Sequence, residues 1–192
     1  MDEIISRYTA AFDELNILTA TSYYSTADID QIVDDILSFL IRAYTLGIQN
    51  AGDMLGSEIK VDVDKMRAAI YAVIEGKTFE DRVIDHVLAG DLGGLTSLAE
   101  NEFTRVYNAA VTDGGLEVKA SLGNGVIKTW ITVGDDKVRD THSYLEGNTV
   151  DVEEDFWTYD GDHAPYPHGF SKAENNVGCR CSVTLHTDVS QI

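Results

Sequence analysis

The amino-acid sequence predicts an α+β fold, in which an N-terminal all-helical part precedes a small α+β domain with a short antiparallel sheet. In the first part, apolar residues recur at the spacing of amphipathic helices. After Asp113-Gly114-Gly115 they alternate as in half-buried strands, and β-branched and aromatic residues become common. We therefore expect a helical assembly region over residues 1–113 and an α+β domain over residues 114–192.

Five helices are expected in the first part, each with one apolar face. Thr26 suits the N-cap of the second helix, and Thr78-x-x-Asp81 has the spacing of a capping box that opens the fourth. The glycine pair after Asp113 is expected to end the fifth helix, which can still pack with the second domain. The expected ranges are 2–20, Thr26 to near Gly47 or Gly52, 64–74, Thr78 to before Gly90, and about 95–112.

The second part should contain three strands and one short helix. Asn124-Gly125 is a turn signal before the first strand, which shows the alternation of a half-buried strand. Asp135 suits the N-cap of the helix, and Gly147 ends it. The segment before the last strand is rich in Asp, Gly, His and Asn and is expected to be a long structured loop. The expected ranges are strands at 126–133, 149–152 and 179–185, a helix at 136–145, and the loop at 153–178.

The net charge of −19 argues against a protein that coats DNA or RNA, because phosphate contacts need clustered Lys and Arg. It also disfavours anionic membranes, and no apolar run approaches the roughly 20 residues of a membrane helix. The acidic N-terminus has the wrong sign for a signal peptide, so we expect a cytosol-like compartment in which cysteines stay reduced. We expect Lys128, Lys137 and Arg139 to be scattered, solvated charges rather than a basic patch.

Cys179 and Cys181 are the only cysteines, and one residue separates them. On a strand, both thiols would face the same side. Together with His142 and either His168 or His163, they would form a ligand set that suits Zn²⁺. The alternative is a pair of buried thiols that pack as small hydrophobic groups. We favour this alternative, because the Cys-x-x-Cys spacing of strong zinc motifs is missing, and we expect neither a metal nor another cofactor.

Asp135 and His142 are a second candidate pair, for acid–base chemistry. Seven positions along one helix would place them on one face but ~10 Å apart, too far for a hydrogen bond. The N-cap role for Asp135 is therefore preferred. The alternative function that remains open is a zinc-dependent hydrolase or nuclease that uses Asp135, His142, Cys179 and Cys181. A third reading is an acidic partner protein, such as an inhibitor of a basic target.

Two arginines in this region are expected to tie elements together. Arg139 can pair with Glu146 or with a carboxylate of the long loop and so hold the short helix against it. Arg180 points away from its flanking cysteines and can make a similar tie. Aromatic residues are expected to supply much of the core of the second domain, namely Trp130, Tyr144, Phe156, Trp157 and Tyr166.

The most specific feature of the chain is a signature of spaced residues in its last third. It comprises Trp130, Thr132, Asp135, Val138, Arg139, His142, Leu145, Gly147, Phe156, Cys179, Arg180 and Cys181. With Pro165 and Pro167 in the loop, it resembles the signature of the phage Mu F-like minor head proteins, the head morphogenesis proteins of tailed phages. Glu102-x-x-Arg105-Val106-x-Asn108 is similar to the helix that leads into that signature. The resemblance covers about residues 95–185.

The sequence departs from the family pattern at two places. Gly178 stands where the family has Asn before the first cysteine, so one hydrogen bond of the loop is expected to be lost. Some members have Cys-x-x-Cys where this chain has Arg139 to His142, and those members look like zinc binders. An arginine cannot coordinate a cation, which strengthens the expectation of no metal. Long members carry an appended toxin or transferase domain, and we expect none here.

The resemblance implies a non-enzymatic virion protein associated with the portal and the procapsid interior. It implies a role in head assembly or DNA delivery, with the portal protein, the major capsid protein or both as partners. The protein would be present in several copies in a larger assembly, in the head interior or at the head–tail vertex, and in the host cytoplasm during assembly. No sequence-specific nucleic-acid binding and no membrane are expected. We also expect Cys179 or Cys181 to lie within reach of His142.

Overall fold

The computed structural model describes residues 29–122 and 125–188. Helices come first and a small antiparallel sheet follows, which confirms the predicted α+β fold. The predicted helix at 2–20 and the cap at Thr26 lie outside the described residues. The helices are α2 (Ile29–Leu55), α3 (Val63–Ile70), α4 (Phe79–Ala89), α5 (Leu92–Leu122), α6 (Asp140–Ser143) and α7 (Ala173–Asn176). The strands are β1 (Val126–Ile131), β2 (Thr149–Asp151), β3 (Phe156–Trp157), β4 (His163–Ala164) and β5 (Ser182–Thr187).

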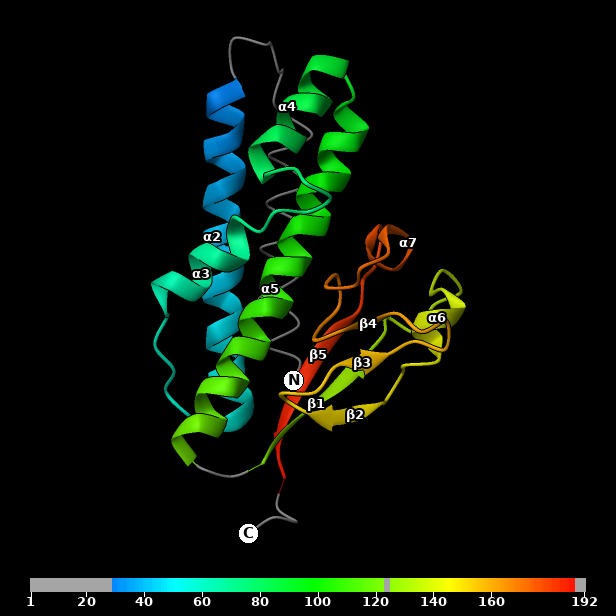
Figure 1. The fold of residues 1–192 in the computed structure, drawn as a ribbon. Coiled ribbons are helices and arrows are strands. Elements are labelled where there is room, and N and C mark those ends of the chain that lie inside the picture. Colours follow the sequence, from blue (N-terminus) through cyan, green and yellow to red (C-terminus); the bar gives the residue numbers. More distant parts are fainter. Residues whose placement is uncertain (1–28, 123–124, 189–192) are drawn as a thin grey trace.

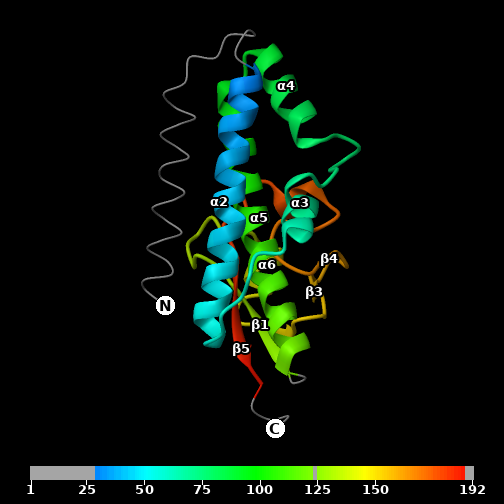
Figure 2. The same ribbon diagram turned by 90° about the vertical axis from the view of Figure 1, so that its left-hand side faces the viewer.

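Helices α2 and α5 lie side by side and run in the same direction, and α3 and α4 connect them (Figures 1 and 2). Small residues allow the two long helices to approach closely. A methyl group on Gly47 would lie 2.6 Å from the Cβ of Ala110, and one on Gly114 would lie 2.5 Å from the Cβ of Ala51. Across the described residues, no helix is long and apolar enough to cross a membrane.

Local signals set the ends of the short helices. Thr78 and Asp81 form the predicted capping box at the start of α4, and Gly90 ends that helix in the left-handed conformation. The third helix begins one residue earlier than predicted, after its cap at Asp62, and is shorter because it ends at Ile70. The prediction that α2 ends near a glycine at 47 or 52 is wrong, since the helix continues to residue 55.

Helix α5 continues through Gly114 and Gly115, so the predicted end at this glycine pair is wrong. The two glycines lie on different sides of α5 and face different elements. Gly114 faces α2, whereas a methyl group on Gly115 would lie 2.9 Å from Val152 and 3.1 Å from Leu185 of β5. These glycines therefore serve close packing on two sides of one helix rather than a helix stop. The division into two domains at residue 114 stays a prediction.

The three-stranded sheet has the antiparallel order β2-β1-β5 and packs against α5 through β1 and β5 (Figure 1). In β1 the side chains of Val126, Lys128 and Trp130 are buried, and the residues between them are half-buried, as the alternation predicted. Trp130 lies opposite Val183 in the register with β5. The buried apolar residues of the helices and of the sheet form one continuous cluster.

Lys128 is fully buried, which corrects the prediction that it is a solvated charge. Its Nζ donates to the carbonyls of Val152 at 3.0 Å and Pro165 at 2.7 Å, and lies 5.4 Å from the centre of the Phe156 ring. Burial lowers the pKa of Lys128 from 10.5 to about 8. The lysine therefore joins β1 to the segment after β2 and to the proline-containing loop.

The segment over residues 153–178 is ordered around one buried carboxylate, Asp162. Its oxygens accept from the hydroxyl of Ser171 at 2.7 Å, the amide of Asn175 at 2.9 Å and the backbone N–H of Lys172 at 3.2 Å. The segment also contains the two-stranded β3-β4 sheet and α7. It is therefore the structured loop that its composition predicted, with more regular structure than expected.

Candidate functional site

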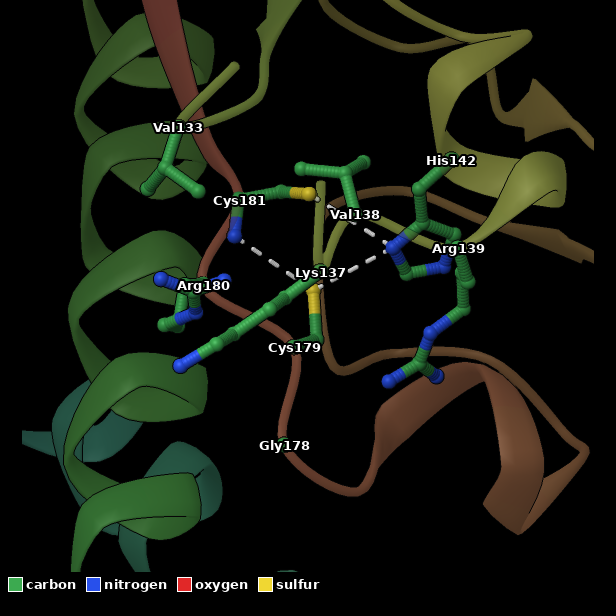
Figure 3. Close-up of a pocket in the computed structure, with 9 residues that line it drawn as sticks. All are labelled: Val133, Lys137, Val138, Arg139, His142, Gly178, Cys179, Arg180 and Cys181. Carbon is green, nitrogen blue, oxygen red and sulfur yellow. Dashed lines mark hydrogen bonds between the residues drawn. The ribbon is translucent and has the colours of Figure 1, made fainter. Parts of the chain in front are cut away.

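His142, Cys179 and Cys181 meet in the interior of the molecule, and all three are buried. One nitrogen and two sulfur atoms lie within 4.8 Å of one another. The Nδ1 of His142 is 3.4 Å from the Sγ of Cys179 and 3.5 Å from the Sγ of Cys181. Figure 3 shows this nitrogen facing both sulfurs. The prediction that a cysteine lies within reach of His142 is confirmed.

The cysteines precede β5, so the predicted last strand starts too early. Strand β1 ends at Ile131, opposite Ser182, and offers the cysteines no partner in the ladder. The side chain of Asn108 on α5 provides hydrogen-bond partners for this backbone instead. Its amide donates to the carbonyl of Cys181 at 3.2 Å, and its carbonyl accepts from the N–H of Val183 at 3.3 Å. A buried side chain of α5 thus fixes the segment that carries both thiols.

His142 lies on α6, which is shorter than the predicted helix. The N-cap position is occupied by Arg139, so the prediction that Asp135 caps this helix is wrong. The oxygens of Asp135 accept from both terminal nitrogens of Arg180, each at 2.8 Å. These hydrogen bonds lower the pKa of Asp135. Asp135 also accepts from the backbone N–H of Lys137 at 3.1 Å, but the helix begins only at Asp140, so this contact closes a turn before the helix and does not cap it.

Arg139 holds α6 against the long loop, as predicted, but through carbonyl groups rather than a carboxylate. Its guanidinium donates to the carbonyl of Glu174 and, at 2.6 Å, to that of Val177. Glu146, the other predicted partner, accepts instead from the N–H of Thr132 at 2.6 Å. The arginine therefore sets the position of the chain just before the first cysteine.

The other histidines considered as ligands have different partners. The Nε2 of His168 lies 2.7 Å from the carbonyl oxygen of Cys179. His163 is exposed, pairs with Asp155 at 2.6 Å and stacks on Trp157. The structure thus brings together three of the four residues named as a metal set.

Aromatic rings enclose the histidine. The ring of Trp130 meets the ring of His142 edge to face, with centroids 5.2 Å apart. The ring of Phe170 stacks on the ring of His142, with centroids 5.5 Å apart. The Nε2 of His142 is buried, and no described residue offers it a hydrogen-bond partner. On the other side the three residues border a small pocket, which is also lined by Val133, Lys137, Val138, Arg139, Gly178 and Arg180 (Figure 3).

Two of the five aromatic residues expected in the core lie at the surface. Trp130 and Phe156 are fully buried, whereas Trp157 is 56% and Tyr144 61% exposed. Tyr144 meets the ring of Tyr159 edge to face at 5.8 Å, so its aromatic contact is with a surface neighbour. The short β3-β4 sheet exposes one side, and that side carries Trp157.

The pKa values of the two thiols are shifted in opposite directions. The hydrogen bond from Cys181 lowers the pKa of Cys179, and the hydrogen bond from His142 acts in the same direction against the effect of burial. The same hydrogen bond to Cys179, together with burial, raises the pKa of Cys181. Both cysteines are free. Cys179 is thus the more readily ionised sulfur of the pair.

Some residues that build the site had no assigned role in the sequence. Asn108 was visible only as part of the lead-in helix, and Asn101 was not singled out. The side chain of Asn101 accepts from the N–H of Gly178 at 2.9 Å, so the glycine that replaces the family's asparagine is held from α5. The available signal was Asn108, because an amide on the buried face of a helix needs partners, with Asn101 two helical turns before it on the same side of α5.

Comparisons with known proteins give one family and one curated relative. The family model described as Phage Mu protein F like protein matches residues 61–184. The chain is 32% identical over 115 residues to a protein of Enterococcus faecalis (strain ATCC 700802 / V583) that is named NAD(+)--arginine ADP-ribosyltransferase EFV. The match covers 59% of this chain and 23% of that relative. No solved structure matches the chain.

Proposed function

Because the chain belongs to the Phage Mu protein F like family, we propose that it is a minor capsid or head morphogenesis protein of a tailed phage. In this role it associates with the portal and the procapsid interior and aids head assembly or DNA delivery. It resides in the head interior or at the head–tail vertex, in several copies, and in the host cytoplasm during assembly. The match over residues 61–184 carries the proposal, since it extends from α3 through the signature into β5.

The contacts of the signature residues support a structural role without catalysis. Both oxygens of Asp135 are engaged by Arg180, and the guanidinium of Arg139 is engaged by two carbonyls. A general base needs a carboxylate or imidazole within reach of a substrate. Arg180 occupies both oxygens of Asp135, which weakens the alternative of a zinc-dependent hydrolase or nuclease that uses this carboxylate as its base.

The transferase name of the Enterococcus relative does not carry over to this chain. The chain spans 23% of that relative, so most of the protein that bears the name has no counterpart in the match. A shared segment in proteins of different length fits a common structural module better than a common reaction. We accordingly propose no enzymatic activity for this chain.

The charge of the chain supports a role beside DNA without tight binding to it. A net charge of −19 opposes contact with phosphates, since such contacts depend on Lys and Arg. The partners in this proposal are therefore proteins, namely the portal protein, the major capsid protein or both. The helical region, with the long paired helices α2 and α5, is the expected contact surface.

Deletion of the gene from its phage genome tests the proposal. We expect fewer DNA-filled heads by electron microscopy and a lower infectious titre, both restored by a plasmid copy. Unchanged heads and titre would contradict it. Pull-down of the tagged protein from procapsids tests the finer statement, since the portal protein should be recovered with it.

A further inference from the structure

We propose that His142, Cys179 and Cys181 bind one Zn²⁺ ion, with a fourth coordination position open to the adjacent pocket. The inference goes beyond the proposed function and does not depend on it. It also reverses the expectation from the sequence that no metal is bound. That expectation depended on the missing Cys-x-x-Cys spacing and on the arginine at position 139, whereas His142, Cys179 and Cys181 converge in the structure.

The spacing of the donor atoms fits a tetrahedral zinc ion. Zn–S bonds of about 2.3 Å and Zn–N bonds of about 2.0 Å place sulfur and nitrogen ligands about 3.5 Å apart around a tetrahedron. The distances from the Nδ1 of His142 to the two sulfurs are 3.4 and 3.5 Å. The two nitrogen-to-sulfur distances thus match the separation that a shared tetrahedral zinc ion would impose on its ligands.

Hydrogen bonding alone explains this arrangement less well. A neutral imidazole nitrogen has either one proton or one lone pair, so Nδ1 can make one good hydrogen bond to a sulfur. Here it faces two sulfurs at nearly equal distances. A cation placed between the three atoms satisfies all of them together. The Nε2 of His142 then carries the proton, and it lies among the rings of Trp130 and Phe170.

The ligands come from separate elements, and other residues hold each in place. Asn108 binds the backbone on both sides of Ser182, and His168 binds the carbonyl of Cys179. Arg139 fixes the chain between α7 and the first cysteine. Such supporting hydrogen bonds orient ligands before the ion binds. The ion would link α6 to the start of β5 and so stabilise the region that contains the signature.

The donor set selects the type of metal. Two thiolates and one imidazole suit Zn²⁺ and not Mg²⁺ or Ca²⁺, which prefer oxygen ligands. The three residues are the one His/Cys/Asp/Glu group with metal-ligand spacing in residues 29–122 and 125–188. Three protein ligands leave one position of a tetrahedron, and all three residues line the pocket. Water or a small thiol from solution would occupy that position.

Metal analysis of the full 192-residue chain, purified under reducing conditions, tests the proposal. We expect close to one zinc per chain after zinc loading and dialysis. Replacement by Co²⁺ should give thiolate-to-cobalt charge-transfer absorption together with intense d–d bands of a tetrahedral site. A small added thiol should shift those d–d bands, because it enters the open position. A cobalt spectrum without thiolate-to-cobalt absorption would overturn the proposal. This measurement uses the wild-type protein alone.

Variants supply a second readout. His142→Gln, Cys179→Ser and Cys181→Ser should each weaken zinc affinity at least about tenfold. His163→Gln is the matched control, since that histidine is exposed and paired with Asp155. Equal zinc content in the control and in all three variants would overturn the proposal. Failure of the head-assembly experiments would leave these results unaffected, so the two proposals are tested separately.

Discussion

Two buried charges, Glu102 and Lys128, have different kinds of partner. Glu102 accepts from Arg82 at 2.8 Å and from Arg105 at 2.8 and 3.1 Å, and its side chain is 4% exposed. Burial alone would raise the pKa of Glu102, but the charges of Arg105 and Arg82 hold it below its usual value. Within residues 29–122 and 125–188, Lys128 has two carbonyl partners and no carboxylate at hydrogen-bond distance. Both residues should therefore add stability as pH rises, Glu102 in the acidic range and Lys128 in the alkaline range.

Lys128 should make the folded state more stable at alkaline pH. Its pKa falls from 10.5 to about 8 on folding, so the charged form is unfavourable in the native state below pH 8. As pH rises from about 8 towards 10.5, the native lysine loses its proton before the unfolded one, and the contribution of Lys128 to the free energy of unfolding rises. The gain is at most about 3 kcal/mol.

Urea unfolding at pH 7 and pH 9.5 measures this effect. Lys128→Met keeps a similar side-chain length and removes the titrating group. The wild-type protein should gain stability relative to this variant between the two pH values. Parallel pH dependence in the two proteins would show that Lys128 keeps its proton in the native state.

Glu102→Gln should be strongly destabilising. It leaves two arginines, 16% and 6% exposed, without their shared carboxylate. Loss of one partner from a buried ion pair costs about 3–5 kcal/mol. The control is Asp135→Asn, because Asp135 and Arg180 are 40% and 46% exposed and such a surface pair contributes up to about 1 kcal/mol. Thermal unfolding compares the two, and equal losses of stability would contradict the account.

At the scale of elements, α5 organises the molecule because it contacts α2 on one side and the sheet on the other (Figure 1). It also supplies Asn108 and Asn101, which hold the segment before β5. Small residues on both sides of α5 allow α2 and the sheet to pack closely against it. Gly114 faces α2 and Gly115 faces the sheet. The position of the Cys-His cluster therefore depends on how closely α5 packs.

Gly47→Ala should destabilise the protein although alanine is the better helix former. The new methyl group would lie 2.6 Å from the Cβ of Ala110 and 2.6 Å from the carbonyl oxygen of Tyr107, which forces α2 and α5 apart. Overpacking of this kind costs about 1–3 kcal/mol. Gly93→Ala is the control, since its nearest neighbour is 3.8 Å away and the change should be neutral or stabilising. Urea unfolding of both variants tests this, and a stabilising Gly47→Ala would contradict the close crossing.

Local signals made part of the fold predictable. Thr78, Asp81 and Gly90 set both ends of α4 through contacts within a few residues, so their roles were evident from the sequence. The glycines at 114 and 115 were misread because their neighbours come from α2 and from the sheet. Asp135 has a local preference for capping, but a partner 45 residues away engages it.

The candidate site was predictable only in part, for the same reason. The spacing of the signature indicated that His142 meets the cysteines, and the structure confirms this contact. The burial of Lys128 was not predictable, because it depends on carbonyls of Val152 and Pro165 that lie far along the chain. The role of Asn108 likewise appears only when α5 and β5 are placed together.

At the scale of the whole molecule, the long helical pair and the small sheet share one core, and the chain carries a large negative charge. The charge suits a protein that lies near packaged DNA without coating it. The sheet part carries the signature of the family, and the helices offer the longest surfaces for contact with neighbours. This division of roles fits a component of a larger assembly.

Quantitative mass spectrometry of purified procapsids and mature heads tests the central claim most directly. The particles should come from the phage genome that encodes this chain, with a strain deleted for the gene as the control. The account predicts the protein in the particles at a constant ratio to the portal protein and well below the major capsid protein. Its absence from both kinds of particle, while it is abundant in the infected cell, would contradict the account.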